Sequence, residues 1–79
     1  MDEETRKYYD TYFELFSSDG WKQLASEIEQ SIGATERATI RQTDDKLFLQ
    51  NVGYVGALSY ILAYPDFVRR SFDELESES

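Results

Sequence analysis

The sequence lacks cysteine and histidine altogether and has a single proline. Without cysteine the chain can form neither a disulfide nor a thiolate zinc site. Without histidine it lacks the commonest metal ligand and the commonest general base. A chain of 79 residues buries only roughly 60 to 65% of its unfolded surface, so its own core is marginal. Small domains with a marginal core are usually stabilised by disulfides, bound metals or partners. Since this chain lacks cysteine and histidine, we expect association with a partner to stabilise it.

No residue pattern predicts a chemical activity. The serines have no histidine, and no motif that carries a lysine, to act as a base. Gly53 and Gly56 lie in an apolar stretch that lacks the lysine of a phosphate-binding loop. Asp44 and Asp45 are expected at a helix start, where the helix dipole favours acids, and not around a metal ion. We therefore expect a protein that is not an enzyme and that carries no cofactor and no metal.

The chain is acidic, with 16 acids, 8 bases and a formal net charge of −8. This charge argues against direct binding to nucleic acid or to an anionic membrane surface. Residues 1–10 are too polar for a signal peptide, and we judge that no apolar run approaches the roughly 20 residues of a membrane span. The expectation is a soluble protein without membrane contact.

The most informative stretch is residues 43–63, which predicts a helix buried on more than one side. One stripe at helical spacing consists of Phe48, Val52, Val55, Ser59 and Leu62. A second stripe consists of Leu47, Tyr54, Leu58 and Ile61. Together they cover more of the helix than one partner helix can bury. We expect further helices of the same chain, a second copy or a foreign partner to cover them.

Three further helices are predicted around this central one. Residues 2–16 form a helix with a broad aromatic face that includes Tyr8, Tyr12 and Phe16. Residues 19–38 form an amphipathic helix that Ser18 caps. The central helix spans residues 44–63, with Thr43 as its cap. A last helix spans residues 65–76, because proline suits a first helical position, and residues 77–79 fray.

Two details of packing are also predicted. Gly53 and Gly56 lower helix propensity, so we expect a neighbouring helix or ring to lie against them, with Trp21 or an aromatic residue of the first helix as the facing ring. Trp21 opens a helix directly after Gly20, so we expect it to join the first helix to the rest.

These elements predict one all-α domain over residues 1–79. Its centre is an antiparallel, coiled-coil-like hairpin of residues 19–38 and 44–63, flanked by short N- and C-terminal helices. Large aromatic and aliphatic side chains of this kind suit protein interfaces. The interface candidates are Tyr8, Tyr12, Phe16, Trp21, Tyr54, Leu58 and Ile61.

The order of features resembles a family of known proteins. One motif is Phe16-x-x-x-Gly20-Trp21-x-x-Leu24. A second begins at Leu47 and runs through Gly53, Val55, Leu58, Ile61 and Leu62, and an acidic tail follows. The pattern is similar to small acidic helical proteins of short-tailed bacteriophages, many of them marine. Asp19 departs from it, because proline is common at that position. The resemblance implies a viral origin but transfers no functional residue.

Two functional hypotheses follow. In the first, the chain is a phage protein that forms a homo-oligomer or binds a virion or assembly component. In the second, it is an acidic inhibitor that docks on a host nucleic-acid-binding enzyme. Either protein would act in the host cytoplasm, and the first could be incorporated in the virion.

Overall fold

The chain folds into helices connected by short turns. The computed structural model describes residues 1–78, which form α1 (Glu3–Ser17), α2 (Asp19–Ile40) and α3 (Asp45–Glu78). Within the described residues there is no strand, so the predicted all-α class is confirmed.

Each helix begins at a polar side chain that accepts hydrogen bonds from the first turn. Asp2 Oδ1 accepts from the Thr5 amide at 2.7 Å, and Ser18 Oγ accepts from the Trp21 amide at 3.1 Å, as predicted for Ser18. Asp44 Oδ1 accepts from the amides of the first α3 turn at 2.9 and 3.1 Å, so Asp44 caps α3 and the prediction of Thr43 was wrong. These bonds satisfy amides that the helix cannot pair internally.

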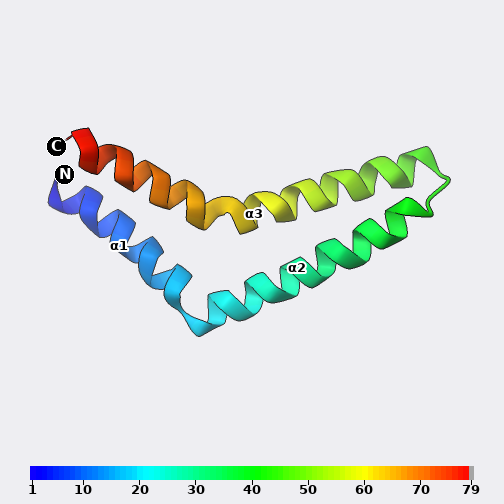
Figure 1. Cartoon of the computed structure of the whole chain (residues 1–79), viewed down its shortest axis with the longest axis horizontal. Helices are drawn as coiled ribbons and strands as arrows, with labels where there is room; N and C mark the ends of the chain where they lie inside the picture. The colour runs from blue at the N-terminus through cyan, green and yellow to red at the C-terminus, as the bar shows by residue number, and fades with distance from the viewer. Residues whose placement is uncertain (79) are drawn as a thin grey trace.

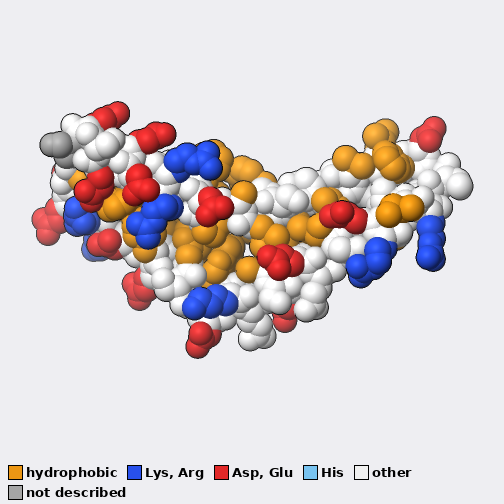
Figure 2. All heavy atoms as spheres, in the orientation of Figure 1, with side chains coloured by type: hydrophobic (Ala, Val, Ile, Leu, Met, Phe, Trp, Pro, Cys, Tyr) orange, Lys and Arg blue, Asp and Glu red, His pale blue; other side chains and the backbone are white. Residues whose placement is uncertain are grey.

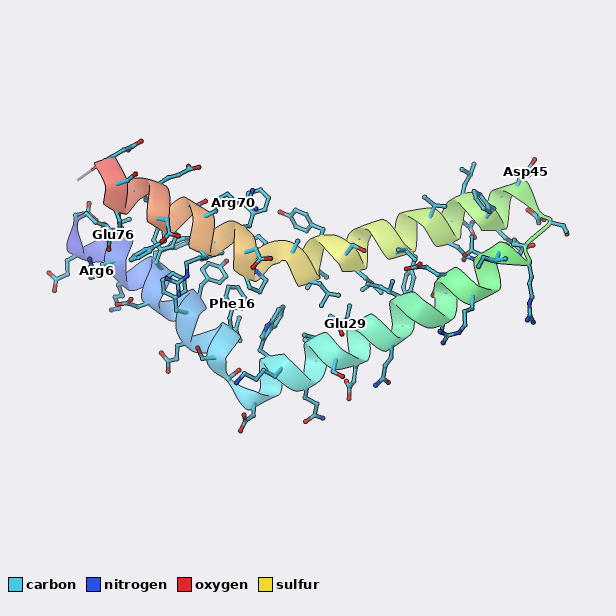
Figure 3. The ribbon with its side chains drawn as sticks, in the orientation of Figure 1. Arg6, Phe16, Glu29, Asp45, Arg70 and Glu76 are labelled. Atoms are coloured by element: carbon cyan, nitrogen blue, oxygen red, sulfur yellow. The ribbon has the colours of Figure 1, made fainter. Side chains whose placement is uncertain are left out.

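The three helices lie in one layer that is bent at its middle (Figure 1). α2 packs along the N-terminal half of α3 and runs in the opposite direction. α1 packs in the same way along the C-terminal half of α3, so the two chain ends meet at one tip of the molecule. There Arg6 donates a hydrogen bond to Glu76 at 3.3 Å (Figure 3).

The predicted break between a central and a last helix was wrong, because α3 runs on without interruption. Pro65 lies inside it. Proline has no amide proton and crowds the preceding turn, which normally costs about 3 kcal/mol and bends a helix. Figure 1 shows the bend near this position, between the part of α3 beside α2 and the part beside α1. α2 packs against the half of α3 before Pro65, and α1 packs against the half after it, so that these contacts hold both halves helical. The predicted frayed tail is also helical to Glu78, and Ser79 lies outside the described residues.

The molecule is far from compact. Its radius of gyration is 16.9 Å, against about 12 Å expected for a compact domain of this length. Its thinnest dimension is 16 Å, which accommodates a single layer of helices. Among the described residues only Tyr9 and Val68 are buried, at 8% and 6% exposure. Most apolar side chains therefore have one side against a neighbouring helix and the other side in solvent.

Candidate interaction surface

A continuous group of aromatic rings, here called the aromatic cluster, lies between α1 and the C-terminal half of α3 and reaches the start of α2. It joins ten of the chain's twelve aromatic residues: Tyr8, Tyr9, Tyr12, Phe13, Phe16, Trp21, Tyr60, Tyr64, Phe67 and Phe72. At its centre the Phe72 ring lies edge-on to Tyr9 and Phe13, with ring centroids 5.4 and 5.1 Å apart. Such edge-to-face pairs are favourable beyond their buried area. The cluster holds α1 onto the C-terminal half of α3.

Trp21 lies where the sequence predicted it, at the junction of α1 and α2. Its ring is half-buried, and its centroid is 5.2 Å from that of Phe16 on α1. Phe16 in turn contacts Tyr64 of α3 at 6.5 Å. The contact therefore ties all three helices together at the bend.

The α2–α3 contact uses one narrow row of side chains on each helix. The half-buried positions on α2 that form this row are Trp21, Ala25, Ile28, Ile32, Thr35 and Thr39. The matching row on α3 is Asn51, Val55, Leu58 and Leu62. Both rows alternate steps of four and three residues, which is the spacing of a two-helix seam. Within residues 1–78 no further helix covers the rest of this part of α3.

The seven interface candidates divide into two groups in the structure. Tyr12, Phe16 and Trp21 are half-buried members of the aromatic cluster, and Tyr8 lies at its edge, 53% exposed. The other three belong to the segment of α3 beside α2. There Leu58 is half-buried toward α2, whereas Tyr54 and Ile61 remain exposed.

The prediction that a neighbouring helix or ring of this chain lies against Gly53 and Gly56 was wrong. A Cβ atom placed on Gly53 or Gly56 would meet no described atom within 4 Å. Neither Trp21 nor a ring of α1 lies against them, since those rings gather around Phe16 and Phe72 instead. The two glycines therefore lie on an open side of α3.

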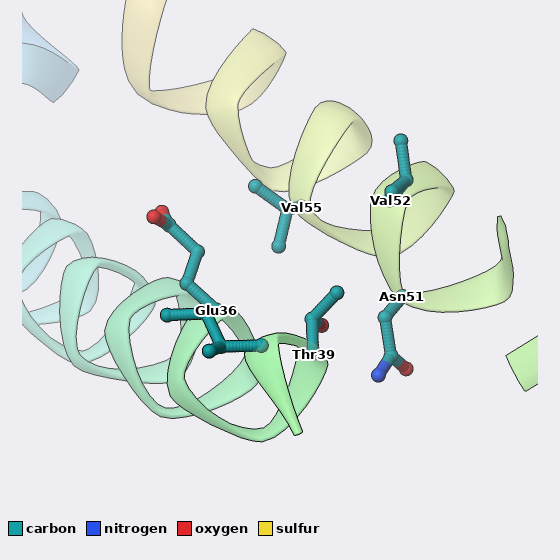
Figure 4. Close-up of a pocket in the computed structure, with 6 residues that line it drawn as sticks. Glu36, Thr39, Asn51, Val52 and Val55 are labelled. Carbon is teal, nitrogen blue, oxygen red and sulfur yellow. The ribbon is translucent and has the colours of Figure 1, made fainter. Parts of the chain in front are cut away.

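Two open grooves interrupt the surface. One has a volume of about 310 Å³ and lies near the α2–α3 turn, between Ile40 of α2 and Val52 of α3 (Figure 4). Ile40 beside it is 85% exposed. The other, of about 250 Å³, lies between Phe13 and Pro65, and the Arg69 guanidinium carbon stands 4.4 Å from the centroid of the Phe13 ring. Glu36 and Thr39 are the polar residues at the first groove beside Asn51, and Ser17, Asp66 and Arg69 are the polar residues at the second.

Charged groups are spread over the surface and mostly face water. On the face shown in Figure 2, acidic side chains lie among hydrophobic ones along the α2–α3 pair. Within residues 1–78 no three acids converge closely enough to hold a metal ion. Hydrogen bonding to Tyr12 raises the pKa of the Tyr64 phenol above its ordinary value, and the Tyr12 charge and partial burial act in the same direction.

The prediction that no apolar run approaches the length of a membrane span was wrong. By length and composition alone, α3 is apolar enough to cross a membrane. Residues 47–65 carry no charge, so the run is nearly as long as a span requires. The core helix of a soluble protein passes the same test, which makes this weak evidence for a membrane protein.

Part of the exposed surface, namely Leu24, Ser31 and Ala38 of α2, was not among the interface residues predicted from the sequence, whereas Tyr54 and Ile61 of α3 were. Leu24, Ser31 and Ala38 recur every seven residues along α2, and Leu47, Tyr54 and Ile61 do so along α3. The seven-residue spacing is visible in the sequence, but which side of each helix is free depends on where α2 and α3 touch. No family model matches the chain, and no curated protein or solved structure is significantly similar to it.

Proposed function

We propose that this chain is a non-enzymatic phage protein that works by protein–protein interaction, assembling with itself or binding a virion or assembly component. The observation that carries the proposal is the large amount of apolar surface that the fold leaves open. The total accessible surface is 6200 Å², whereas a compact monomer of 9.2 kDa has about 4,900 Å². Large hydrophobic residues such as Ile40, Leu49 and Tyr60 are among those exposed. Exposed apolar patches larger than a few hundred Å² mark interaction sites in soluble proteins.

The architecture that supports this function is a coiled-coil-like hairpin of α2 and the N-terminal half of α3. The half-buried rows of the two helices have the four-and-three spacing typical of such seams. A two-helix hairpin buries only one stripe of each helix, so α3, which is uncharged over residues 47–65, needs a further neighbour.

Sedimentation equilibrium of the purified chain tests the self-assembling form of the proposal. We expect a dimer or higher oligomer at micromolar concentration. A monomer of 9.2 kDa at every concentration would reject self-assembly and leave only a foreign partner.

The second candidate is the acidic inhibitor of a host nucleic-acid enzyme. It is favoured by the charge at the tip where the chain ends meet, which combines Asp2, Glu3 and Glu4 with Asp73, Glu74, Glu76 and Glu78. Such a tip could dock on a basic surface. Purification of the tagged chain from infected cells, followed by mass spectrometry, separates the two: virion components support the first candidate, and a host polymerase or nuclease supports the second.

A further inference from the structure

The α2–α3 pair has two sides, and helix geometry assigns residues to each. Successive residues of an α-helix are rotated by about 100°. Residues that precede the contact row by one position therefore lie on one side of the pair, and residues that follow it by one lie on the other. Because the two helices are antiparallel, the residues that precede the contact row on α2 lie on the same side of the layer as the residues that precede it on α3.

The side that precedes the contact rows carries one charged residue, Glu27, which directly precedes Ile28 and lies at the outer edge of this side. Nearer the contact rows are Leu24, Ser31 and Ala38 from α2 and Tyr54, Ile61 and, seven residues before Tyr54, Leu47 from α3; these six residues carry no charge and are here called the uncharged face. All six side chains are exposed. The opposite side carries Lys22, Glu29 and Glu36 of α2, and Figure 2 shows its mixture of acidic and hydrophobic groups.

We propose that a second copy of this chain covers the uncharged face, so that the two α2–α3 pairs stack into a four-helix bundle. This inference rests on the self-assembly proposed above and names the surface that performs it. The chain exposes roughly 1,300 Å² more than a compact monomer of its mass. A specific interface takes about 800 Å² from each partner, and obligate homodimers take more. The excess surface is therefore of the size that a stable dimer buries.

Electrostatics favours this side for contact between identical chains. Two copies that each carry a net charge of −8 repel one another, and burying unpaired acids is costly. Contact through the opposite side would bury Glu29 and Glu36 of both copies in the interface. Contact through the uncharged face leaves these acids in water.

The uncharged face is also complementary to itself in side-chain size. Its α3 row has three large side chains, Leu47, Tyr54 and Ile61, whereas the α2 row includes the small residues Ser31 and Ala38. A two-fold axis parallel to the helices lays α3 of one copy on α2 of the other. The large Tyr54 ring then lies over the small side chains Ser31 and Ala38 of the second copy. Every helix runs antiparallel to its neighbours, as in most four-helix bundles.

A lipid bilayer is the competing occupant, because α3 is apolar enough to span one. However, Asn51 and Leu58 of α3 lie against α2 along its length. Insertion with α2 still attached would carry Lys22, Glu29 and Glu36 into hydrocarbon, where charges are strongly disfavoured. A second copy requires no such burial.

The test compares two matched glutamate substitutions in the full chain. Tyr54 and Val52 are 50% and 51% exposed on opposite sides of the same helix segment. Sedimentation equilibrium should show that Tyr54→Glu weakens dimerisation roughly 100-fold or more, because it buries an unpaired charge. Val52→Glu should leave the dimer constant unchanged. The reverse pattern would overturn the uncharged face while leaving self-assembly intact, whereas a monomeric wild type would reject both.

A cross-linking experiment covers the case in which Tyr54→Glu unfolds the chain. Because the protein has no cysteine, single-cysteine variants report one position each. A mixture of Ser31→Cys and Tyr54→Cys chains should form covalent heterodimers with a short bismaleimide, and a mixture of Glu29→Cys and Val52→Cys chains should not. Cross-linking of only the second mixture would overturn the proposal. Wild type that floats with phosphatidylcholine vesicles and is monomeric without them would overturn it in favour of a bilayer.

Discussion

Replacement of Gly56 by alanine should make the protein more stable. Glycine in a helix interior costs roughly 0.5 to 1 kcal/mol relative to alanine, because it loses more backbone freedom on folding. The added methyl group would meet no described atom within 4 Å, so no packing cost offsets the gain. Gly56 also follows the contact residue Val55, which places it on the side away from the uncharged face. The same gain is therefore expected in the dimer.

The expected size of this effect is measurable. A gain of 1 kcal/mol raises the Tm of a domain of 60 to 100 residues by about 4 to 8 °C. Thermal melts followed by far-ultraviolet circular dichroism, at equal protein concentration, give the difference directly. Adding Gly53→Ala, whose methyl group would also meet no described atom within 4 Å, should roughly double the shift. Gly20→Ala is the control, because Gly20 lies in the first turn of α2, where helix propensity counts for less.

A fall in Tm for Gly56→Ala would refute the reasoning. It would mean that another molecule packs closely on the side of α3 opposite the uncharged face. Gly56→Leu sharpens the distinction, since overpacking against a neighbour costs typically 1 to 3 kcal/mol, whereas an open site tolerates the larger side chain.

Three further predictions concern the aromatic cluster. Phe72→Ala should lower the free energy of unfolding by about 3 kcal/mol, because the Phe72 ring lies against Tyr9 and Phe13 of α1. Phe67 is 59% exposed, so the control Phe67→Ala should lower it by less than about 1 kcal/mol. Denaturant titrations measure both values. Trp21→Ala should lower the free energy of unfolding by about 2 to 3 kcal/mol, which is below the range for a fully buried ring because Trp21 is half-buried. Trp21 of the native protein should fluoresce at a shorter wavelength than Trp21 of the protein unfolded in urea. Equal spectra and an unchanged melt would show that Trp21 packs against nothing in the fold. The raised pKa of Tyr64 means that the folded chain holds this proton more tightly than the unfolded chain, so its contribution to stability is complete below the ordinary value of 10.0 and is lost as pH rises above it. The Tm of Tyr64→Phe should therefore fall less than that of the wild type between neutral pH and pH values above 10, and equal falls would contradict the assignment.

Local signals predicted the helices well. The period of the apolar residues and the capping serine at position 18 depend on neighbours within one or two turns, so they can be read from the chain alone. Pro65 misled the prediction for the opposite reason. Its local preference is to start a helix, but packing on both sides of it holds one bent helix together.

The same contrast applies to the candidate surface. That α3 is apolar on more than one side follows from its composition, because an uncharged run of residues 47–65 offers no polar face to water. The sequence does not specify which side α2 takes, nor that the rings of α1 gather around Phe72 rather than beside Gly56. Those outcomes depend on contacts between residues far apart in the chain, where the direction of each helix and the bend at Pro65 decide which side chains meet. Helix formation is a property of neighbouring residues, whereas the free surface is what remains after distant segments have packed.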